Sequence, residues 1–269
     1  MIDRSEALGA TRKQVLAEEV QKTVLTSMSL GGCFDSIVFH GGTALRLFHG
    51  KPRFSEDIDL VMVKGVDSFD LNEHMAHVGR YVEDAFPFLD SVVTRSQRDD
   101  PRLQRQILRT VSDDHGQIVR VHIELAPVPS HRNGPRILDH PPVRPAVRVE
   151  DQVEILADKV CALAFRPYLK GRDLWDVHFL TEERSVDLDV GLVMMKTTDY
   201  EETVPGLVEG LTRSTVRVRG EGMSIMEDEM SRFLPAGVLE AYGPTFGNVV
   251  ARVVEVIDRS LDMIGAVDP

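Results

Sequence analysis

The sequence predicts an α+β protein, in which an N-terminal half of mixed α/β character is followed by a mainly helical C-terminal half. Short β-branched and aromatic runs alternate with helical stripes up to a proline-rich passage at 127–145. From residue 150 onward the apolar residues keep helical spacing. A chain of 269 residues can hold two domains with separate cores. We therefore expect domains at 1–148 and 149–269.

The elements of the N-terminal half follow from local patterns. The glycine pairs Gly31-Gly32 and Gly41-Gly42 interrupt the apolar periodicity, and residues 113–116 have the composition of a hairpin turn. Arginines at 98, 102, 105 and 109 also fit one helix face, but the turn and the alternation around residue 109 favour a strand there. The predicted elements are helix 3–29, strand 36–40, helix 43–49, strand 58–63, helix 70–85, and strands 103–111 and 118–126.

Composition narrows the class of protein. Hydrophobic residues make up 42% and charged residues 28%, as is typical of a folded domain. We see no apolar run near the roughly 18 residues of a membrane helix, and the charged N-terminus does not resemble a signal peptide. Two cysteines cannot form a disulfide framework or a zinc cluster alone. We expect a cytoplasmic protein without a membrane partner.

The net charge is unevenly distributed. The whole chain carries −12, which argues against non-specific coating of nucleic acid. The segment 95–148 nevertheless holds ten arginines and six acids, a net charge of +4 that leaves −16 for the rest. This segment is either a solvated arginine-rich surface or a local patch that faces phosphates.

Asp57 and Asp59 form the strongest chemical motif. They are separated by one residue in a predicted strand, so their carboxylates point the same way while Ile58 faces the core. Two carboxylates held together repel each other unless a cation neutralises them, and oxygen ligands suit Mg²⁺. The pair therefore predicts a metal site.

A glycine turn precedes this acidic pair. Gly41 and Gly42 permit close approach of a ligand to the backbone, and the following helix offers free N–H groups to a phosphate. Thr43 could cap that helix or reach the phosphate, and Arg53 and Ser55 could contact a triphosphate. The alternatives are a glycine pair that only packs strand on helix, a surface arginine and a turn serine.

Together these motifs resemble a known family. Gly41-Gly42-Thr43-Ala44-Leu45 followed by Arg53-Phe54-Ser55-Glu56-Asp57-Ile58-Asp59-Leu60 is similar to the signature of the AbiEii/MenT nucleotidyltransferase toxins, in the DNA polymerase β-like nucleotidyltransferase superfamily. Downstream, 156–163 resembles the family's lysine helix, and Gly171-Arg172-Asp173-Leu174-Trp175-Asp176 resembles its Arg-Asp-x-x-Asp motif. The resemblance spans about 40–180, and little is recognisable after residue 181.

The resemblance implies a polymerase β-like mixed sheet and a site for Mg²⁺, with Mn²⁺ as a substitute, and a nucleoside triphosphate. The family has a third carboxylate on a later strand, for which Glu124 is our candidate; the structural alternative pairs Glu124 with Arg120 or Arg109. Metal ligands would then be Asp57, Asp59 and Glu124, and catalytic residues Asp57, Asp59, Lys159 and Asp176. Nucleotide-binding residues would be Gly41, Gly42, Thr43, Arg53, Ser55, Lys159 and Arg172.

Three of these residues have structural alternatives. Lys159 lies in an apolar helical stretch, where either a triphosphate or a carboxylate would offset its desolvation. Arg172 could bind phosphate or carboxylate, and with Asp176 it could instead belong to a salt-bridge cluster. Trp175 and Phe179 are expected in the core.

The resemblance also implies a function. We expect a toxin of a toxin–antitoxin system that transfers a nucleoside monophosphate to RNA, at the 3′ end of tRNA, and so blocks translation. An antitoxin protein would be its partner. The alternatives are nucleotide transfer to a small molecule or a protein, and a non-catalytic nucleotide-binding module of the same fold.

Overall fold

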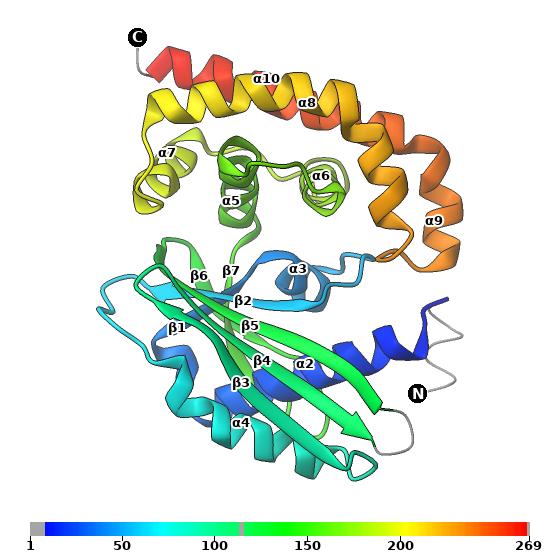
Figure 1. Ribbon diagram of the computed structural model, residues 1–269. Helices are drawn as coiled ribbons and strands as arrows, with labels where there is room; N and C mark the ends of the chain where they lie inside the picture. Colours follow the sequence, from blue (N-terminus) through cyan, green and yellow to red (C-terminus); the bar gives the residue numbers. More distant parts are fainter. Residues whose placement is uncertain (1–8, 113–115, 268–269) are drawn as a thin grey trace. The chain divides into compact units, whose positions relative to one another are not determined.

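The computed structural model describes residues 9–112 and 116–267. The chain divides into two compact units, Met1–Glu150 and Asp151–Pro269, referred to below as the N-terminal unit and the C-terminal unit. Figure 1 shows a sheet in the first unit and helices in the second. None of the helices in the described residues has the length and apolar character needed to cross a membrane.

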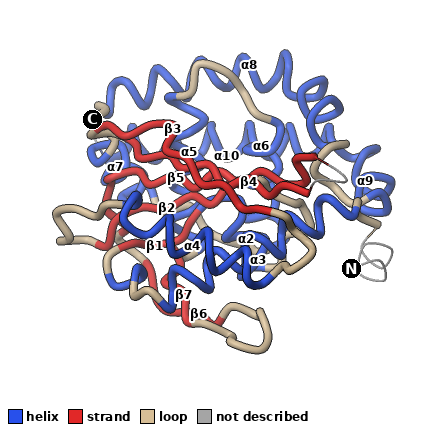
Figure 2. Tube along the Cα trace, turned by 60° about the horizontal axis from the view of Figure 1, so that its bottom comes forward, coloured by secondary structure: helices blue, strands red, loops and turns tan. Residues whose placement is uncertain are grey.

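The N-terminal unit is built on a mixed seven-stranded sheet with the order β3-β4-β5-β2-β1-β7-β6. Strand β2 pairs in parallel with β5, and β1 in parallel with β7, while the other neighbours are antiparallel. Figure 2 shows β3 and β6 at opposite edges. The strands are β1 Ile37–His40, β2 Asp57–Val63, β3 Ser91–Asp100, β4 Leu103–Ser112, β5 Gly116–Ser130, β6 Asn133–Ile137 and β7 Ala146–Glu150.

Helices α2 and α4 cover one face of this sheet (Figure 1). Alternate side chains of β5, among them Val121 and Ile123, point to this face and are fully buried. The residues between them on β5, such as His122, face the other side and are partly exposed. The helices of this unit are α2 Arg12–Leu30, α3 Gly41–His49 and α4 Leu71–Ala85.

All seven predicted elements of the N-terminal unit are present, with shifted ends. Helix α2 begins at Arg12 and not at residue 3, because Thr11 caps it through a capping box with Gln14. Residues 1–8 of that prediction and residues 113–115 of the predicted turn lie outside the described residues. Helix α3 begins two residues early, so that Gly41 and Gly42 form its first turn.

The sequence prediction missed strands β3, β6 and β7 and ended β5 too early. Strand β3 is an edge strand with mostly exposed side chains, so it lacks the apolar alternation that marks a strand. Strand β5 continues through Pro127 and Pro129 to Ser130, where its register with β2 shifts between Leu60 and Met62. Prolines are tolerated at such irregularities and on edge strands, which explains why this proline-rich passage still forms sheet.

The C-terminal unit is helical, as its apolar spacing predicts. Helix α8 packs against α5, α6 and α10. Trp175 and Phe179 are buried, which confirms their prediction as core residues, and the Trp175 ring meets Tyr242 edge to face at 5.1 Å between centroids. The helices are α5 Gln152–Phe165, α6 Gly171–His178, α7 Val190–Asp199, α8 Val204–Met230, α9 Ala236–Tyr242 and α10 Phe246–Val267.

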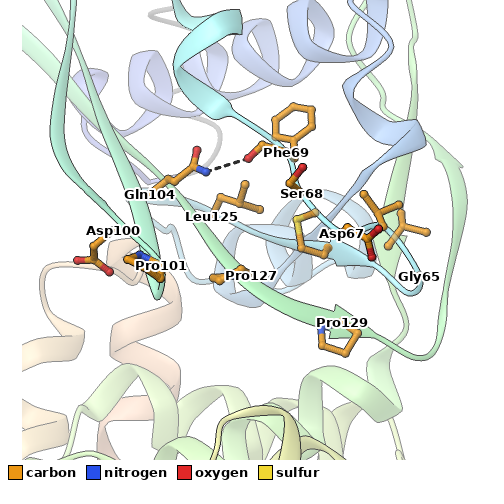
Figure 3. Close-up of a pocket in the computed structure, with 13 residues that line it drawn as sticks. Gly65, Asp67, Ser68, Phe69, Asp100, Pro101, Gln104, Leu125, Pro127 and Pro129 are labelled. Carbon is orange, nitrogen blue, oxygen red and sulfur yellow. Dashed lines mark hydrogen bonds between the residues drawn. The ribbon is translucent and has the colours of Figure 1, made fainter.

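A cavity of about 400 Å³ lies beside β2 and β5 in the N-terminal unit (Figure 3). Gln104 on β4 holds the backbone at the edge of the cavity. Its side chain donates to the Phe69 carbonyl at 2.8 Å and accepts from the Leu71 N–H at 2.7 Å. Leu125 lines the cavity, and its strand neighbour Glu124 points to the opposite face of the sheet. The cavity is therefore separate from the acidic residues described next.

Candidate active site

Sheet register brings the predicted carboxylates together in the N-terminal unit. Asp59 on β2 is the register partner of Glu124 on β5, and Asp57 is the partner of His122. Neighbouring strands lie about 4.8 Å apart, and register partners present their side chains on the same face. Asp57, Asp59 and Glu124 thus form one acidic group, on the face opposite α2 and α4.

Two of these carboxylates already have cationic or hydrogen-bonding partners. His122 Nδ1 lies 3.0 Å from Asp57 Oδ1, and Arg105 Nε lies 2.8 Å from Glu124 Oε1. Arg105 comes from β4, where it is the register partner of Glu124. The structural alternative for Glu124 named the wrong arginines, because the hairpin register places Arg120 and Arg109 four residues further along the strands.

Gly41 is required by both its conformation and its surroundings. Its φ is +76°, and an ideal Cβ would lie only 2.6 Å from Asp59 Oδ2. The Asp59 carboxylate therefore rests against the first turn of α3. Any side chain at this position would be strained and would displace the carboxylate.

We expect Gly41→Ala to abolish activity and to lower the free energy of unfolding by about 1–2 kcal/mol or more. Gly50→Ala is the matched control, because Gly50 has the same φ of +76° but no atom within 4 Å of an ideal Cβ. The control should show the conformational cost alone and keep its activity. Equal activity of the two variants, measured per folded molecule, would contradict the placement of Asp59 against Gly41.

Gly42 lies beneath a cluster of polar side chains from the segment before β2. An ideal Cβ on Gly42 would lie 2.7 Å from Arg53 Nη2, 3.1 Å from Ser55 Oγ and 3.4 Å from Lys51 Nζ. Arg53 and Lys51 are both buried. Two buried cations at the positive end of a helix raise the electrostatic potential there, which favours an anion. Arg53 and Ser55 thus lie beside the glycine turn, and Arg53 is buried, so it is not the surface arginine of the alternative interpretation.

The segment that carries these cations is held by α2 and α3. Arg46 on α3 donates to the carbonyl oxygens of Lys51 and Pro52 at 3.2 and 2.8 Å. The same guanidinium forms an ion pair of 2.7 Å with Glu18 on α2, which is 4% exposed. These contacts fix the backbone from which Lys51 and Arg53 extend.

Thr43 has a different contact from either one expected. Its hydroxyl donates to the backbone carbonyl of Asp57, and its side chain is buried. His40 and not Thr43 occupies the N-cap position of α3. Thr43 therefore ties α3 to the beginning of β2.

In the C-terminal unit, Lys159 is the centre of an ion-pair cluster. Its Nζ lies 2.8 Å from Asp173 and 2.9 Å from Asp176, both on α6, and Arg166 also pairs with Asp173. Burial opposes the charged forms, but the ion pairs outweigh it: the pKa of Lys159 is raised, and the pKa of Asp173 is lowered to about 2. Carboxylates are thus the partners that offset the desolvation of Lys159 within this unit.

Arg172 precedes this cluster on α6. Its backbone N–H donates to Glu229 at 3.4 Å, and its guanidinium lies 5.9 Å from the centre of the Phe233 ring. This cation–π contact holds the planar group in one orientation.

The donor set of the N-terminal unit fits a divalent cation of the Mg²⁺ type. Asp57, Asp59 and Glu124 supply only carboxylate oxygens, the ligands that Mg²⁺ and Mn²⁺ accept. Their partial exposure leaves room for water and phosphate oxygens, which Mg²⁺ retains.

The sequence analysis did not single out Lys51, and it placed Arg105 among the arginines of the segment 95–148 without its contact to Glu124. Lys51, Arg53 and Ser55 alternate with Pro52 and Phe54, so the spacing by two was a signal that the three side chains share one side. Arg105 carried no signal of its own, because its contact with Glu124 depends on the hairpin register between two strands.

Comparisons with known proteins agree with this geometry. A family model described as "Nucleotidyl transferase AbiEii toxin, Type IV TA system" matches residues 23–247. A crystal structure of a candidate nucleotidyltransferase from H. pylori is 17% identical, with coverage of 94% of this chain and 98% of its own, and a TM-score of 0.58. JHP933 from Helicobacter pylori, also 17% identical, covers 96% and 99%, with a TM-score of 0.55. At this identity both show the fold alone. No curated protein matches the chain.

Proposed function

Because the chain belongs to the AbiEii nucleotidyltransferase toxin family of toxin–antitoxin systems, we propose that it transfers a nucleoside monophosphate to an RNA acceptor with the help of a divalent metal. Membership in the family makes the chain a nucleotidyltransferase with a nucleoside triphosphate substrate and implies an antitoxin counterpart. Beyond what family membership implies, we propose the RNA acceptor and the metal requirement.

The nucleotide's phosphates would bind at the first turn of α3. Arg53, Ser55 and the additional cation Lys51 converge on Gly42, whose missing side chain lets them approach the backbone. Backbone N–H groups at a helix start and nearby cations are the elements of a phosphate site. Gly41, with Asp59 against it, would place the α-phosphate beside the carboxylates.

Asp57, Asp59 and Glu124 would hold the metal. When bound, the metal would lower the pKa of the acceptor hydroxyl and stabilise negative charge on the α-phosphate. Thr43 fixes the start of β2 through its bond to the Asp57 carbonyl and so positions both aspartates. His122 orients the Asp57 carboxylate through its contact of 3.0 Å.

The acceptor would lie along the arginines on the same face of the sheet. Arg109 and Arg120 are register partners on β4 and β5, and Arg98 and Arg105 are partners on β3 and β4. Arg98 and Arg105 already pair with Asp100 and Glu124, respectively. Like charges directly opposite each other on neighbouring strands, such as Arg109 and Arg120, are destabilising, and bound phosphates would relieve this repulsion. The group also includes Arg95, so five of the ten arginines between 95 and 148 share this face.

This arginine face adjoining the carboxylates is the observation that carries the proposal. Glu124 and Arg105 are register partners, so the basic face begins where the acidic group ends. An RNA backbone on the arginines would place a terminal hydroxyl at the carboxylates. Resemblance to the toxins favours the 3′ end of tRNA as that terminus.

The resemblance also assigns Lys159, Asp176 and Arg172 to the reaction. We propose that this assignment holds for Arg172 through its guanidinium, which can bind phosphate. Lys159 and Asp176 would act while remaining paired with each other.

Incubation with each of the four α-labelled nucleoside triphosphates, Mg²⁺ and purified tRNA tests the proposal directly. We expect label on tRNA with at least one nucleotide, and its loss when the metal is chelated. The same incubation with a tRNA-free extract in place of tRNA tests for other acceptors. Label confined to protein or small molecules there, or nucleotide binding without any transfer, would favour the alternatives and contradict an RNA acceptor.

A charge-reversal pair tests the arginine face. The double variant Arg95→Glu with Arg109→Glu should weaken tRNA modification. It should also reduce the slope of log K for tRNA binding against log salt concentration by about two, because each lost phosphate contact releases about one fewer counterion. The control replaces Arg80 on α4 and Arg136 on β6, which are exposed arginines elsewhere, by Glu. It changes the net charge equally, so an equal effect of both pairs would refute the acceptor path.

A further inference from the structure

Arg105 links the two charged groups on this face of the sheet. Its Nε lies 2.8 Å from Glu124 Oε1, with the Arg105 side chain 34% and that of Glu124 23% exposed. It is also the register partner of Arg98 on its other side, and it belongs to the arginine face. Arg105 therefore belongs to that face and also contacts a carboxylate proposed to bind metal.

A metal ion and the Arg105 guanidinium cannot both occupy Glu124 without cost. Asp59 and Glu124 are adjacent across two parallel strands, so a divalent ion between them would lie within a few ångströms of the guanidinium. Two cations at this separation repel each other, and the carboxylate oxygen that pairs with Arg105 would be needed as a ligand.

We propose that Arg105 is an internal counterion of Glu124 that competes with the divalent metal and is displaced when the metal binds. This inference rests on the proposed function of the acidic group. Before the metal binds, Arg105 offsets the repulsion between Glu124 and Asp59 and keeps Glu124 in position. Once displaced, its guanidinium joins the other arginines of the face, where an acceptor phosphate can bind it.

The competition predicts a tighter metal site when Arg105 is removed. In Arg105→Gln, Mn²⁺ should bind about twofold to fivefold more tightly than in the wild type, as expected for loss of a partly exposed ion pair. The variant's melting temperature should be lower than that of the wild type without metal, and it should rise more on addition of Mn²⁺.

The experiment measures Mn²⁺ affinity by calorimetry and melting temperature in the full-length chain, with no nucleotide present. Arg109→Gln is the matched control, because Arg109 lies on the same strand and the same face, four residues from Arg105. It removes the same charge but leaves the Glu124 ion pair intact, so its Mn²⁺ affinity should stay near the wild-type value. Arg105→Lys, which keeps the charge and loses the planar guanidinium, should fall between wild type and Arg105→Gln.

The outcomes separate this inference from the proposed function. Equal Mn²⁺ affinities in the wild type, Arg105→Gln and Arg109→Gln would overturn the competition while leaving the metal site standing. Weaker binding in Arg105→Gln would show that Arg105 supports the ligands and does not compete. Absence of Mn²⁺ binding in all three would overturn the metal site and the inference with it. Should Arg105→Gln fail to fold, the same comparison is made with Arg105→Lys.

Discussion

Replacement of Asp59 by Asn is expected to lower nucleotide transfer by about 10³-fold or more while the protein still folds. Asp59 is next to both Glu124 and the first turn of α3, so it would contact the metal and the α-phosphate together. Removal of one of several repelling carboxylates should not lower the free energy of unfolding without metal, and should raise it slightly. Transfer rates and melting curves of the same preparations check both statements.

Glu56→Gln is the control for this variant. Glu56 is the exposed acid that precedes β2, so its substitution removes the same charge close to the site without changing the candidate ligands. It should retain nearly all activity. A similar loss in both variants would indicate a general effect of charge, and near wild-type activity of Asp59→Asn would remove the metal assignment.

Lys159→Met is expected to lower the free energy of unfolding by about 3–5 kcal/mol at neutral pH, because it removes the cation that Asp173 and Asp176 share and leaves the buried Asp173 with Arg166 alone of its two cations. The resemblance alone had suggested a phosphate contact whose loss would cost little stability. Denaturant unfolding measures the difference, which should be the largest among the stability changes predicted for this chain.

The pH dependence of this difference has a definite sign. The pKa of Asp173 is lowered to about 2 in the folded protein, so its pairing contributes stability above an unfolded pKa near 4. That contribution is lost as the pH falls from about 4 toward 2. The stabilities of wild type and Lys159→Met should therefore converge over this range, and a constant difference would contradict the ion-pair assignment.

Lys196→Met separates a catalytic role of Lys159 from a structural one. Lys196 is a second buried lysine of the C-terminal unit, paired with Glu154 at 3.0 Å and Asp158 at 3.2 Å. Both variants should be destabilised. If Lys159 takes part in the reaction, its variant alone should lose activity per folded molecule, whereas equal specific activities would assign Lys159 to folding only.

Local patterns were sufficient to predict the elements that carry the acidic pair. Asp57 and Asp59 are two residues apart in a strand with Ile58 between them, so their common face follows from strand geometry alone. The glycine turn and the cations before β2 lie within fifteen residues of each other, which made their proximity predictable. The helical half was predicted for the same reason, since its periodicity is local.

The parts of the fold and of the site that the sequence analysis missed depend on pairings between distant parts of the chain. That Glu124 lies beside Asp59 is a matter of register between β2 and β5, which are 65 residues apart in that pairing. The contact of Arg105 with Glu124 is likewise set by hairpin register, and strand β3 lacks an apolar face because it lies at a sheet edge. No tight turn sets the register of a parallel pair such as β2 and β5, so local patterns give no direct information about it.

The mass of tRNA after reaction tests the central claim most directly. Purified wild-type protein and the Asp59→Asn variant are incubated with tRNA, Mg²⁺ and one unlabelled nucleoside triphosphate at a time. The mass of the intact tRNA is then measured by mass spectrometry. We expect the wild type to increase the tRNA mass by whole nucleoside monophosphates, with pyrophosphate released, and Asp59→Asn to leave it unchanged. An unchanged tRNA mass with every nucleotide, or the same increase with Asp59→Asn, would contradict the account.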